Sequence, residues 1–307
     1  MLTVTFLGTA GSVPSLDRSL PAVLFARGGD RLLFDCGEGT QRQMMRARTG
    51  FGIRAVFLSH FHADHTLGVP GLLQTLNLMG REEPLLICGP DHTEDFAERL
   101  VELGYLDLHF DVRFRTLEPG MSACFEGYEV RAFATCHSVP SVGYALVEEE
   151  RPGRFDPERA RELGVGEGPD FGRLQQGEPV ETEGGMVEPD QVMGPPRPGR
   201  RVVYTGDSRP HEAMLPHLEG ADLWISEGTF GDEFRQKAEE TGHSTARAAA
   251  ALAREAGVRR LILTHISTRY SDGAHLLLEQ AREEFERVGL AEDLLRVEVP
   301  LPEAETG

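Results

Sequence analysis

Short apolar runs separated by turn residues open the chain. Residues 2–7 alternate between apolar and polar positions, and residues 22–26 and 31–35 form two further runs around the turn Gly28-Gly29-Asp30. Runs of this kind, bounded by glycine and aspartate, predict β-strands in a meander. Residues 55–58 are continuously apolar, as expected for a strand that is buried on both faces. The N-terminal part therefore predicts a β-sheet.

Segments with helical spacing follow and alternate with further strands. The predicted helices cover residues 41–48, 66–79, 94–103, 244–256 and 274–288, and a further strand covers residues 128–135. This mixture predicts an α/β fold in which helices pack on the faces of a sheet.

Polar side chains follow four of the later strand-like runs. The runs at 130–135, 201–205, 222–226 and 260–264 lead to His137, Asp207, Glu227 and His265, respectively. In sheets that pack against helices, functional sites gather at the carboxyl ends of strands. One such residue is more often a turn or cap residue, but recurrence on four strands indicates a common site.

The strongest chemical signal comes directly after the apolar run at 55–58. His60, His62, Asp64 and His65 occupy four of six consecutive positions in the spacing H-x-H-x-D-H. A single histidine here would more often be a hydrogen-bonded core or surface residue. Four such ligands after a strand end can converge on one or two cations, and imidazole with carboxylate suits zinc. We therefore predict a metal site at this position.

The composition changes sharply after residue 147. Residues 151–200 contain 10 glycines and 8 prolines, and only residues 157–163 are a helical candidate. A segment of this composition is expected to lack a core of its own. Because strands of the same sheet bracket it, we interpret residues 148–200 as an arm that interrupts a single domain covering residues 1–307.

The charge of the chain limits its possible partners. The formal net charge is −19, which opposes binding to a polyanion such as RNA. Lys237 is the only lysine, so nearly all cations are arginines, the side chain best suited to phosphate. A GC-rich coding bias with an acidic surface explains this balance, and adaptation to high intracellular salt is an alternative hypothesis.

Cysteine usage and hydropathy indicate a cytoplasmic protein. Cys36, Cys88, Cys124 and Cys136 are widely separated, so we expect buried free thiols rather than disulfides or a thiolate zinc site. The chain shows neither an N-terminal signal pattern nor an apolar stretch of the roughly 20 residues that a membrane span needs. We expect no membrane partner.

Motifs along almost the whole chain resemble those of the ribonuclease Z family, within the metallo-β-lactamase superfamily. They are FLGTAGSVP, LLFDCGEGTQRQM, LSHFHADHTLGVPGLL, the HS of ATCHSVPSVGYAL, YTGDSRP, SEGTF, GHST and LTHIS, in the family's order. The H-x-H-x-D-H spacing identifies only the superfamily, whereas SEGTF, GHST and the arm are more specific. The resemblance implies a four-layer αββα sandwich with a projecting Gly/Pro-rich arm.

The resemblance also implies a ligand set and a reaction. Two zinc ions would be bound per subunit. One would be held by His60, His62 and His137, and the other by Asp64, His65 and His265. Asp207 would bridge the two ions. Asp64 would also accept a proton from the attacking water. His243 of GHST would donate a proton to the departing oxygen, and Glu227 would orient it. The expected activity is removal of the 3' trailer from precursor transfer RNA, leaving a 3'-hydroxyl and a 5'-phosphate.

The arm resembles the family's exosite, particularly at residues 168–174. Such an arm would hold the transfer-RNA body, usually from the partner subunit of a homodimer. The chain departs from the family in the loop at residues 14–19, where Leu16 and Ser19 replace the lysine and asparagine of P-x-K-x-R-N. Two rival hypotheses remain: another hydrolase of the superfamily, such as a sulfatase or small phosphodiesterase, and a non-catalytic RNA-binding protein.

Overall fold

The computed structural model describes residues 1–103 and 107–302, and these form two compact units. The first unit is Met1–Val147 with Arg200–Pro300. The second is Glu148–Gly199, with Leu301 and Pro302 grouped with it. None of the described helices is long and apolar enough to cross a membrane.

The first unit contains a mixed sheet in the order β18-β1-β3-β4-β5-β6-β7. Its strands are β1 (Leu2–Gly8), β3 (Ala22–Arg27), β4 (Asp30–Phe34), β5 (Ala55–Phe57), β6 (Leu85–Gly89), β7 (Val112–Thr116) and β18 (Arg296–Val299). β1, β3 and β4 pair antiparallel, which confirms the predicted meander, and β4 to β7 pair parallel.

A second sheet has the order β17-β15-β14-β13-β10-β9-β8. Its strands are β8 (Ser122–Phe125), β9 (Tyr128–Ala134), β10 (Val142–Glu148), β13 (Arg201–Tyr204), β14 (Leu223–Glu227), β15 (Leu261–Thr264) and β17 (Val288–Leu290). The short strands β2 (Ala10–Gly11) and β16 (Ile266–Ser267) pair with each other and bring Gly11 beside the end of β15.

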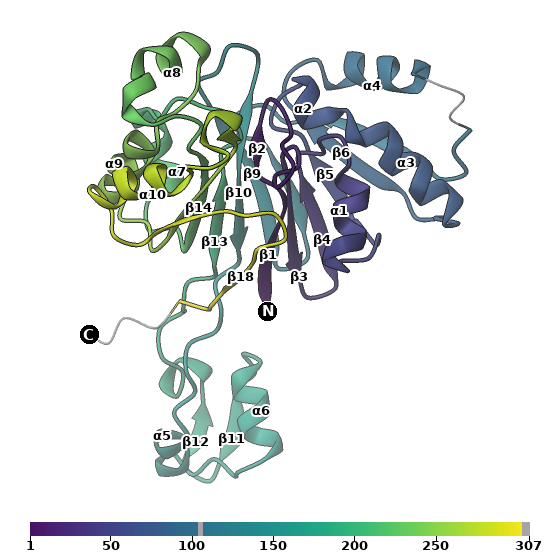
Figure 1. Ribbon diagram of the computed structural model, residues 1–307. Helices are drawn as coiled ribbons and strands as arrows, with labels where there is room; N and C mark the ends of the chain where they lie inside the picture. The colour runs from purple at the N-terminus through teal and green to yellow at the C-terminus, as the bar shows by residue number, and fades with distance from the viewer. Residues whose placement is uncertain (104–106, 303–307) are drawn as a thin grey trace. The chain divides into compact units, whose positions relative to one another are not determined.

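Helices cover the outer faces of the two sheets (Figure 1). One group consists of α1 (Thr40–Ala47), α2 (Ala63–Thr66), α3 (Gly68–Leu78) and α4 (Thr93–Glu102). The other consists of α7 (Leu215–Leu218), α8 (Arg235–Thr241), α9 (Ala246–Glu255) and α10 (His275–Arg282), with the 3₁₀ turns η2 (Glu212–Met214), η3 (Asp232–Phe234) and η4 (Thr268–Tyr270). The predicted four-layer αββα sandwich is confirmed.

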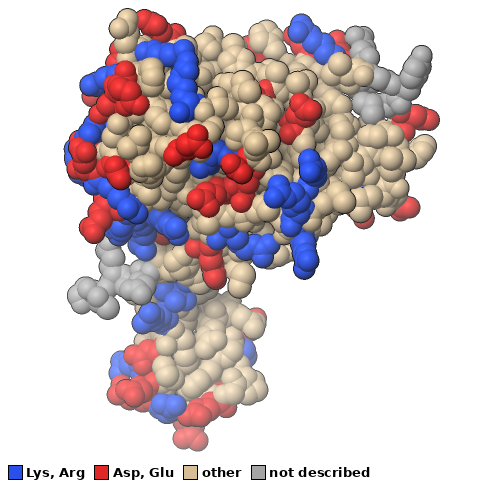
Figure 2. Space-filling model, viewed as in Figure 1, with Lys and Arg blue, Asp and Glu red and all other residues tan. Residues whose placement is uncertain are grey.

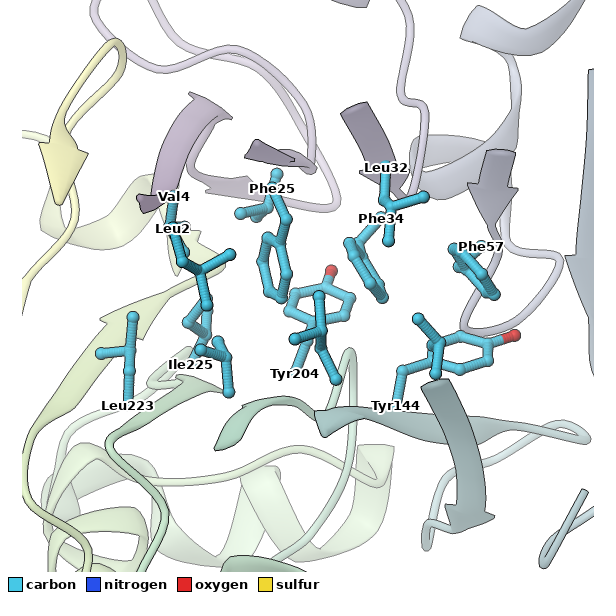
Figure 3. Packing of buried hydrophobic residues seen from close by; sticks show 14 of the residues in the cluster. Leu2, Val4, Phe25, Leu32, Phe34, Phe57, Tyr144, Tyr204, Leu223 and Ile225 are labelled. Atoms are coloured by element: carbon cyan, nitrogen blue, oxygen red, sulfur yellow. The ribbon is translucent and has the colours of Figure 1, made fainter. Parts of the chain in front are cut away.

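Alternate positions of the central strands face different layers. Phe25, Phe34 and Phe57 point into the core between the sheets, where they meet Tyr144 and Tyr204 of the second sheet (Figure 3). The residues directly before them in sequence, Leu24, Leu33 and Val56, pack against the outer helices instead. Burial on both faces explains why these strands are continuously apolar in sequence.

Two helix predictions need correction. The predicted helix at 66–79 begins earlier, as the single turn α2 followed by α3, and Pro70 is tolerated in the first turn of α3. The predicted helix at 274–288 ends at Arg282. Val288 is instead buried in β17 and pairs in parallel with Leu261. Pairing with a neighbouring strand overrides the local helical pattern there.

The second unit has more structure than its composition predicts. It contains α5 (Pro157–Glu162), α6 (Pro169–Gln175), the hairpin of β11 (Val180–Thr182) and β12 (Gly185–Val187), and the 3₁₀ turn η1 (Pro189–Gln191). The expectation that it lacks a core is wrong. Its buried apolar cluster is formed by Ala160, Val165, Leu174, Val180, Val187 and Val192.

The second unit is inserted between two paired strands. β10 and β13 are antiparallel neighbours, and Val147 lies opposite Arg201 in their register. Its two ends therefore leave and re-enter the same sheet at adjacent positions.

Candidate active site

Strand ends of both sheets deliver the predicted metal ligands. His60 and His62 lie in the loop after β5, and Asp64 and His65 lie on α2, which begins directly after that loop. His137, Asp207 and His265 follow β9, β13 and β15, respectively. The buried strands thus hold residues from distant parts of the sequence at one location.

These side chains form overlapping groups of possible ligands. In each group, one donor atom per residue lies within 4.8 Å of the others. The groups are His60, His62, His137 and Asp207; then Asp64, His65 and His265; then Asp207, His243 and His265. All seven predicted metal ligands therefore lie together, and none of the cysteines belongs to these groups.

Asp207 lies between the two histidine groups. Its Oδ2 atom is 3.8 Å from His60 Nε2, 3.4 Å from His65 Nε2 and 3.2 Å from His265 Nε2. Its Oδ1 atom is buried and has no hydrogen-bond partner among the described residues. Burial opposes the negative charge, but these histidines, His265 foremost, hold the pKa of Asp207 well below its usual range. A buried carboxylate oxygen without a partner fits the position of a cation.

The histidines also present the donor set that a divalent metal requires. His60 Nε2 lies 3.0 Å from His62 Nδ1, and His65 Nε2 lies 3.3 Å from His265 Nε2. Burial lowers the pKa of His60 well below 6.5, and burial with His137 lowers that of His62. The rings of His60 and His62 are therefore neutral, which is the form that binds metals. The facing ring nitrogens of the site, together with carboxylates, fit a divalent cation.

A second set of contacts fixes the orientation of these rings. His65 Nδ1 lies 2.7 Å from Asp35 Oδ2, and His60 Nδ1 lies 3.0 Å from Ser59 Oγ. His137 Nδ1 lies 2.9 Å from the carbonyl of Gly242, and His265 Nδ1 lies 2.9 Å from Thr229 Oγ1. Partners of this kind select the tautomer that directs the other nitrogen toward a metal.

Asp35 is the main member of this supporting set that the sequence reasoning missed. It is buried, accepts hydrogen bonds from both the backbone and the hydroxyl of Ser59, and accepts one from Tyr204 at 2.5 Å. Burial alone would lower the pKa of His65, but Asp207 and Asp35 raise it well above 6.5. This reflects the negative potential that a cation would offset. The only sequence signal for Asp35 is an aspartate directly after an apolar strand; in the structure it has a positive φ of 55°.

Glu227 and His243 form a separate pair beside the ligands. Glu227 is buried at the end of β14, where it accepts hydrogen bonds from Ser208 N at 2.8 Å and Ser244 N at 2.9 Å. It also contacts His243 Nδ1 at 3.1 Å. Burial would lower the pKa of His243, but Glu227 raises it to about 9. His243 is therefore protonated at neutral pH.

The segment after His243 leads into α9. The N-cap of α9 is Thr245, whose side chain accepts a hydrogen bond from Ala248 N. The backbone of Ser244 donates to Glu227, which ties the GHST turn to the carboxylate.

The loop at residues 14–19 begins at the edge of the metal site. Ser12, which has a positive φ of 60°, donates its backbone N–H to Asp64 Oδ2 at 2.9 Å. Arg18 holds the far end of the loop through Thr9 Oγ1 at 2.7 Å. Leu16 is fully exposed.

The cysteines match the prediction only in part. All four are free, as expected, and Cys36 and Cys88 are buried. Cys124 is exposed and Cys136 is half-buried, so the expectation of buried thiols is wrong for these two.

Comparison with known proteins places the chain in one family. The Metallo-beta-lactamase superfamily profile matches residues 18–216, and the Beta-lactamase superfamily domain matches residues 191–266. Ribonuclease Z of Methanosarcina acetivorans is 54% identical over 98% of this chain and 99% of its own length. Ribonuclease Z of Haloferax volcanii is 52% identical over 100% and 98% of the two chains.

Solved structures agree with this assignment. The short form of human tRNase Z has a TM-score of 0.70 at 30% identity, covering 97% of this chain and 100% of that chain. A metallo-beta-lactamase fold protein of Bacillus subtilis, YhfI, also has a TM-score of 0.70, at 22% identity over 96% and 98% of the chains, which shows a shared fold. From the full-length matches and the gathered histidine and aspartate ligands, we conclude that the chain belongs to the ribonuclease Z family of metal-dependent phosphodiester hydrolases in the metallo-β-lactamase superfamily.

Proposed function

We propose that this chain is a zinc-dependent endoribonuclease that removes the 3' trailer from precursor transfer RNA. The observation that carries the proposal is the position of Asp207 between two ligand groups, with the Glu227–His243 pair beside it. The full-length ribonuclease Z relatives support this function over a sulfatase or a small phosphodiesterase. The complete ligand set argues against a protein that only binds RNA.

Two zinc ions fit the donor chemistry of this site. We assign His60, His62 and His137 to one ion, Asp64, His65 and His265 to the other, and Asp207 to both. When bound, two such cations lower the pKa of a water molecule and stabilise negative charge on the phosphate.

Asp64 is the proposed acceptor of a proton from the attacking water. The backbone N–H of Ser12 donates to Asp64 Oδ2, and this oxygen lies 3.5 Å from both His65 Nε2 and His265 Nε2. The orientation of the Asp64 carboxylate is therefore fixed by contacts with Ser12 and with the two histidines. Histidines nearby outweigh the effect of burial and lower the pKa of Asp64, so it is ionised before the reaction. In-line attack of the water oxygen on phosphorus then breaks the bond to the 3' oxygen.

His243 is the proposed donor of a proton to the departing 3' oxygen. An alkoxide is a poor leaving group, so a positioned acid is needed. Because its Nδ1 contacts Glu227, the Nε2 proton remains for transfer. The products are a 3'-hydroxyl on the transfer RNA and a 5'-phosphate on the trailer. Glu227 is a positioning residue in this scheme, since it orients the ring and stabilises its charge.

The second unit is the proposed exosite for the transfer-RNA body, acting within a homodimer. Acidic and basic side chains are interspersed on the visible face of each unit (Figure 2). The net charge of −19 is therefore a smaller obstacle to RNA binding than it would be if the acidic side chains covered these faces alone. Arg159, Arg161 and Arg173 contact Glu162, Glu167 and Glu178, respectively. Arg151 and Arg197 contact backbone carbonyls instead, and Arg154 makes no ion pair among the described residues. These last three are the better candidates for phosphate contacts.

The test is an assay of a 3'-extended transfer-RNA precursor with both product ends mapped. We expect one cut at the trailer junction, with a 3'-hydroxyl on the transfer RNA and a 5'-phosphate on the trailer. Removal of zinc by a chelator should abolish the cut, and added zinc should restore it. Failure of the zinc-loaded protein to cut the precursor, or cutting that leaves a 3'-phosphate, would contradict the proposal.

A further inference from the structure

A cavity of about 430 Å³ lies beside His243, outside the ligand set. Its walls include Arg209 from the loop after β13, Arg235, Ala238 and Glu239 from α8, and Ala248 from α9. Pockets that bind small molecules typically measure about 300–1,000 Å³. This cavity is therefore large enough for a single nucleotide, and the metal site does not account for it.

The charge of this cavity differs from that of the chain as a whole. Arg209 donates to Cys136 Sγ at 3.0 Å and has no carboxylate partner among the described residues. The side chain of Arg235 is 75% exposed and reaches only Glu239, at 3.6 Å. Glu239 also lines the cavity, so two guanidinium groups face one carboxylate there. Arg209, and Arg235 if it exchanges its long ion pair, can pair with phosphate or stack on a base. The cavity therefore has a small excess of positive charge in a chain of net charge −19.

The direction of the reaction determines which nucleotide would reach the cavity. His243 is a wall of the cavity and also the proposed donor to the leaving 3' oxygen. A proton donor must lie within hydrogen-bond distance of the atom that it protonates. The leaving oxygen belongs to the ribose of the last nucleotide kept by the transfer RNA. That ribose must therefore lie against His243 during the reaction, next to the opening of this cavity.

We propose that this cavity binds the last nucleotide kept by the transfer RNA, with its base between the walls formed by α8 and α9 and with Arg209 and Arg235 near its 5' phosphate. Unpaired bases are commonly bound by stacking on arginine or ring side chains. The small side chains of Ala238 and Ala248 leave room for the base. This inference rests on the proposed function, because it takes the identity of the leaving group from it.

The first test combines an enzyme change with a substrate change. Ala248→Leu narrows the cavity, and Ala251→Leu is the matched control, because Ala251 is on the same helix, is also half-buried and does not line the cavity. Each protein is assayed on a precursor with an intact last nucleotide and on one that is abasic at that position. Thermal unfolding shows whether each variant is folded.

We expect the native protein to cleave the abasic precursor about tenfold less efficiently, the scale of one lost stacking contact. Ala248→Leu should lose about tenfold in kcat/KM on the intact precursor and little on the abasic one, whereas Ala251→Leu should match the native protein. Equal losses on both precursors, or no loss, would overturn the inference. A native protein that cannot cut the precursor at all would instead overturn the proposed function.

A second pair of variants tests the cationic wall. Arg235→Ala should lower kcat/KM about fivefold on the intact precursor, which is the scale of one solvent-exposed charge pair. Lys237→Ala removes the same charge from an exposed position on the same helix, outside the cavity, and should have little effect. Equal effects of the two substitutions would reduce the role of Arg235 to general electrostatics and would contradict its assignment to this nucleotide.

Discussion

The two units of this chain differ in the size of the buried apolar clusters that stabilise them. In the first unit, Phe34 packs against Phe25 and Phe57 with ring-centroid distances of 4.2 and 5.1 Å, inside one of three large buried clusters. In the second unit, one small cluster of six buried side chains supports two short helices and a hairpin. A large core can hold metal ligands at fixed distances, whereas a small core suffices to present a binding surface.

This difference separates the expected effects of substitutions. Changes at the metal site of the first unit should reduce the hydrolysis of every phosphodiester. Changes in the second unit should reduce only the cleavage of a substrate large enough to reach it. A small diester such as bis-nitrophenyl phosphate distinguishes the two cases.

The largest effect is expected for Asp207→Ala. The carboxylate lies near both ligand groups, so its loss should reduce the content of both metal ions rather than one. Cleavage of precursor and of bis-nitrophenyl phosphate should fall to the level of the control without enzyme. Elemental analysis measures the metal content, and Asp272→Ala, at an exposed aspartate of the same unit, is the control. Two retained ions with near-normal cleavage would rule out the bridging role.

The next largest effect is expected when residues 153–198 are replaced by a short Gly-Ser linker. The flanking strands β10 and β13 are paired neighbours, and no proposed ligand lies in the replaced segment. Precursor cleavage should fall by about 10²–10⁴-fold, the scale of losing a second binding module. Hydrolysis of bis-nitrophenyl phosphate should persist within about tenfold. Normal precursor processing would contradict the exosite assignment, and loss of both activities with unfolding would show that the segment supports the first unit.

The sequence predicted the first unit more accurately than the second for a physical reason. Strands such as β5 are buried on both faces, so they leave continuous apolar runs that end at the ligands. The core of the second unit uses isolated apolar residues, such as Val165 and Leu174, among glycines and prolines without helical or strand periodicity. Two short helices, a hairpin and the turns between them bring these residues together, so composition alone suggested no core.

The same reasoning explains what was missed at the site. The gathering of the candidate ligands was predictable because histidine and aspartate recur at strand ends, and four of them follow β5 in a metal-binding spacing. Asp35, Ser59 and Thr229 act through hydrogen bonds that depend on neighbouring strands and loops, which the spacing of residues in one segment cannot show. The cavity beside His243 is likewise formed by segments far apart in the sequence.

A smaller effect that depends on the leaving group is expected for His243→Ala. Metal content should remain, because the seven assigned ligands are intact. Precursor cleavage should slow by about 100-fold or more, the scale of losing a positioned general acid. A nitrophenolate departs without protonation, so hydrolysis of bis-nitrophenyl phosphate should slow much less. Equal losses on both substrates would indicate a structural role at the start of α9 and would separate this residue from the proton transfer.

The smallest effect is expected for Leu174→Ala in the core of the second unit. Leu174 is fully buried on α6, and truncation of a buried leucine costs about 2–5 kcal/mol. Because its cluster has only six buried members, this loss should open the second unit locally. Hydrogen exchange should then increase within residues 155–192 and remain unchanged in β13, β14 and β15.

The functional consequence of Leu174→Ala completes the comparison of the two units. Precursor kcat/KM should fall by about tenfold, less than after the linker replacement, because the segment can fold again on binding at an added cost in free energy. Hydrolysis of bis-nitrophenyl phosphate should not change. Met186→Ala is the matched control, since Met186 is exposed on β12 of the same unit and its truncation opens no cavity. Increased exchange in β13 and β14 of the Leu174→Ala variant would show that the two cores unfold together and would refute their independence.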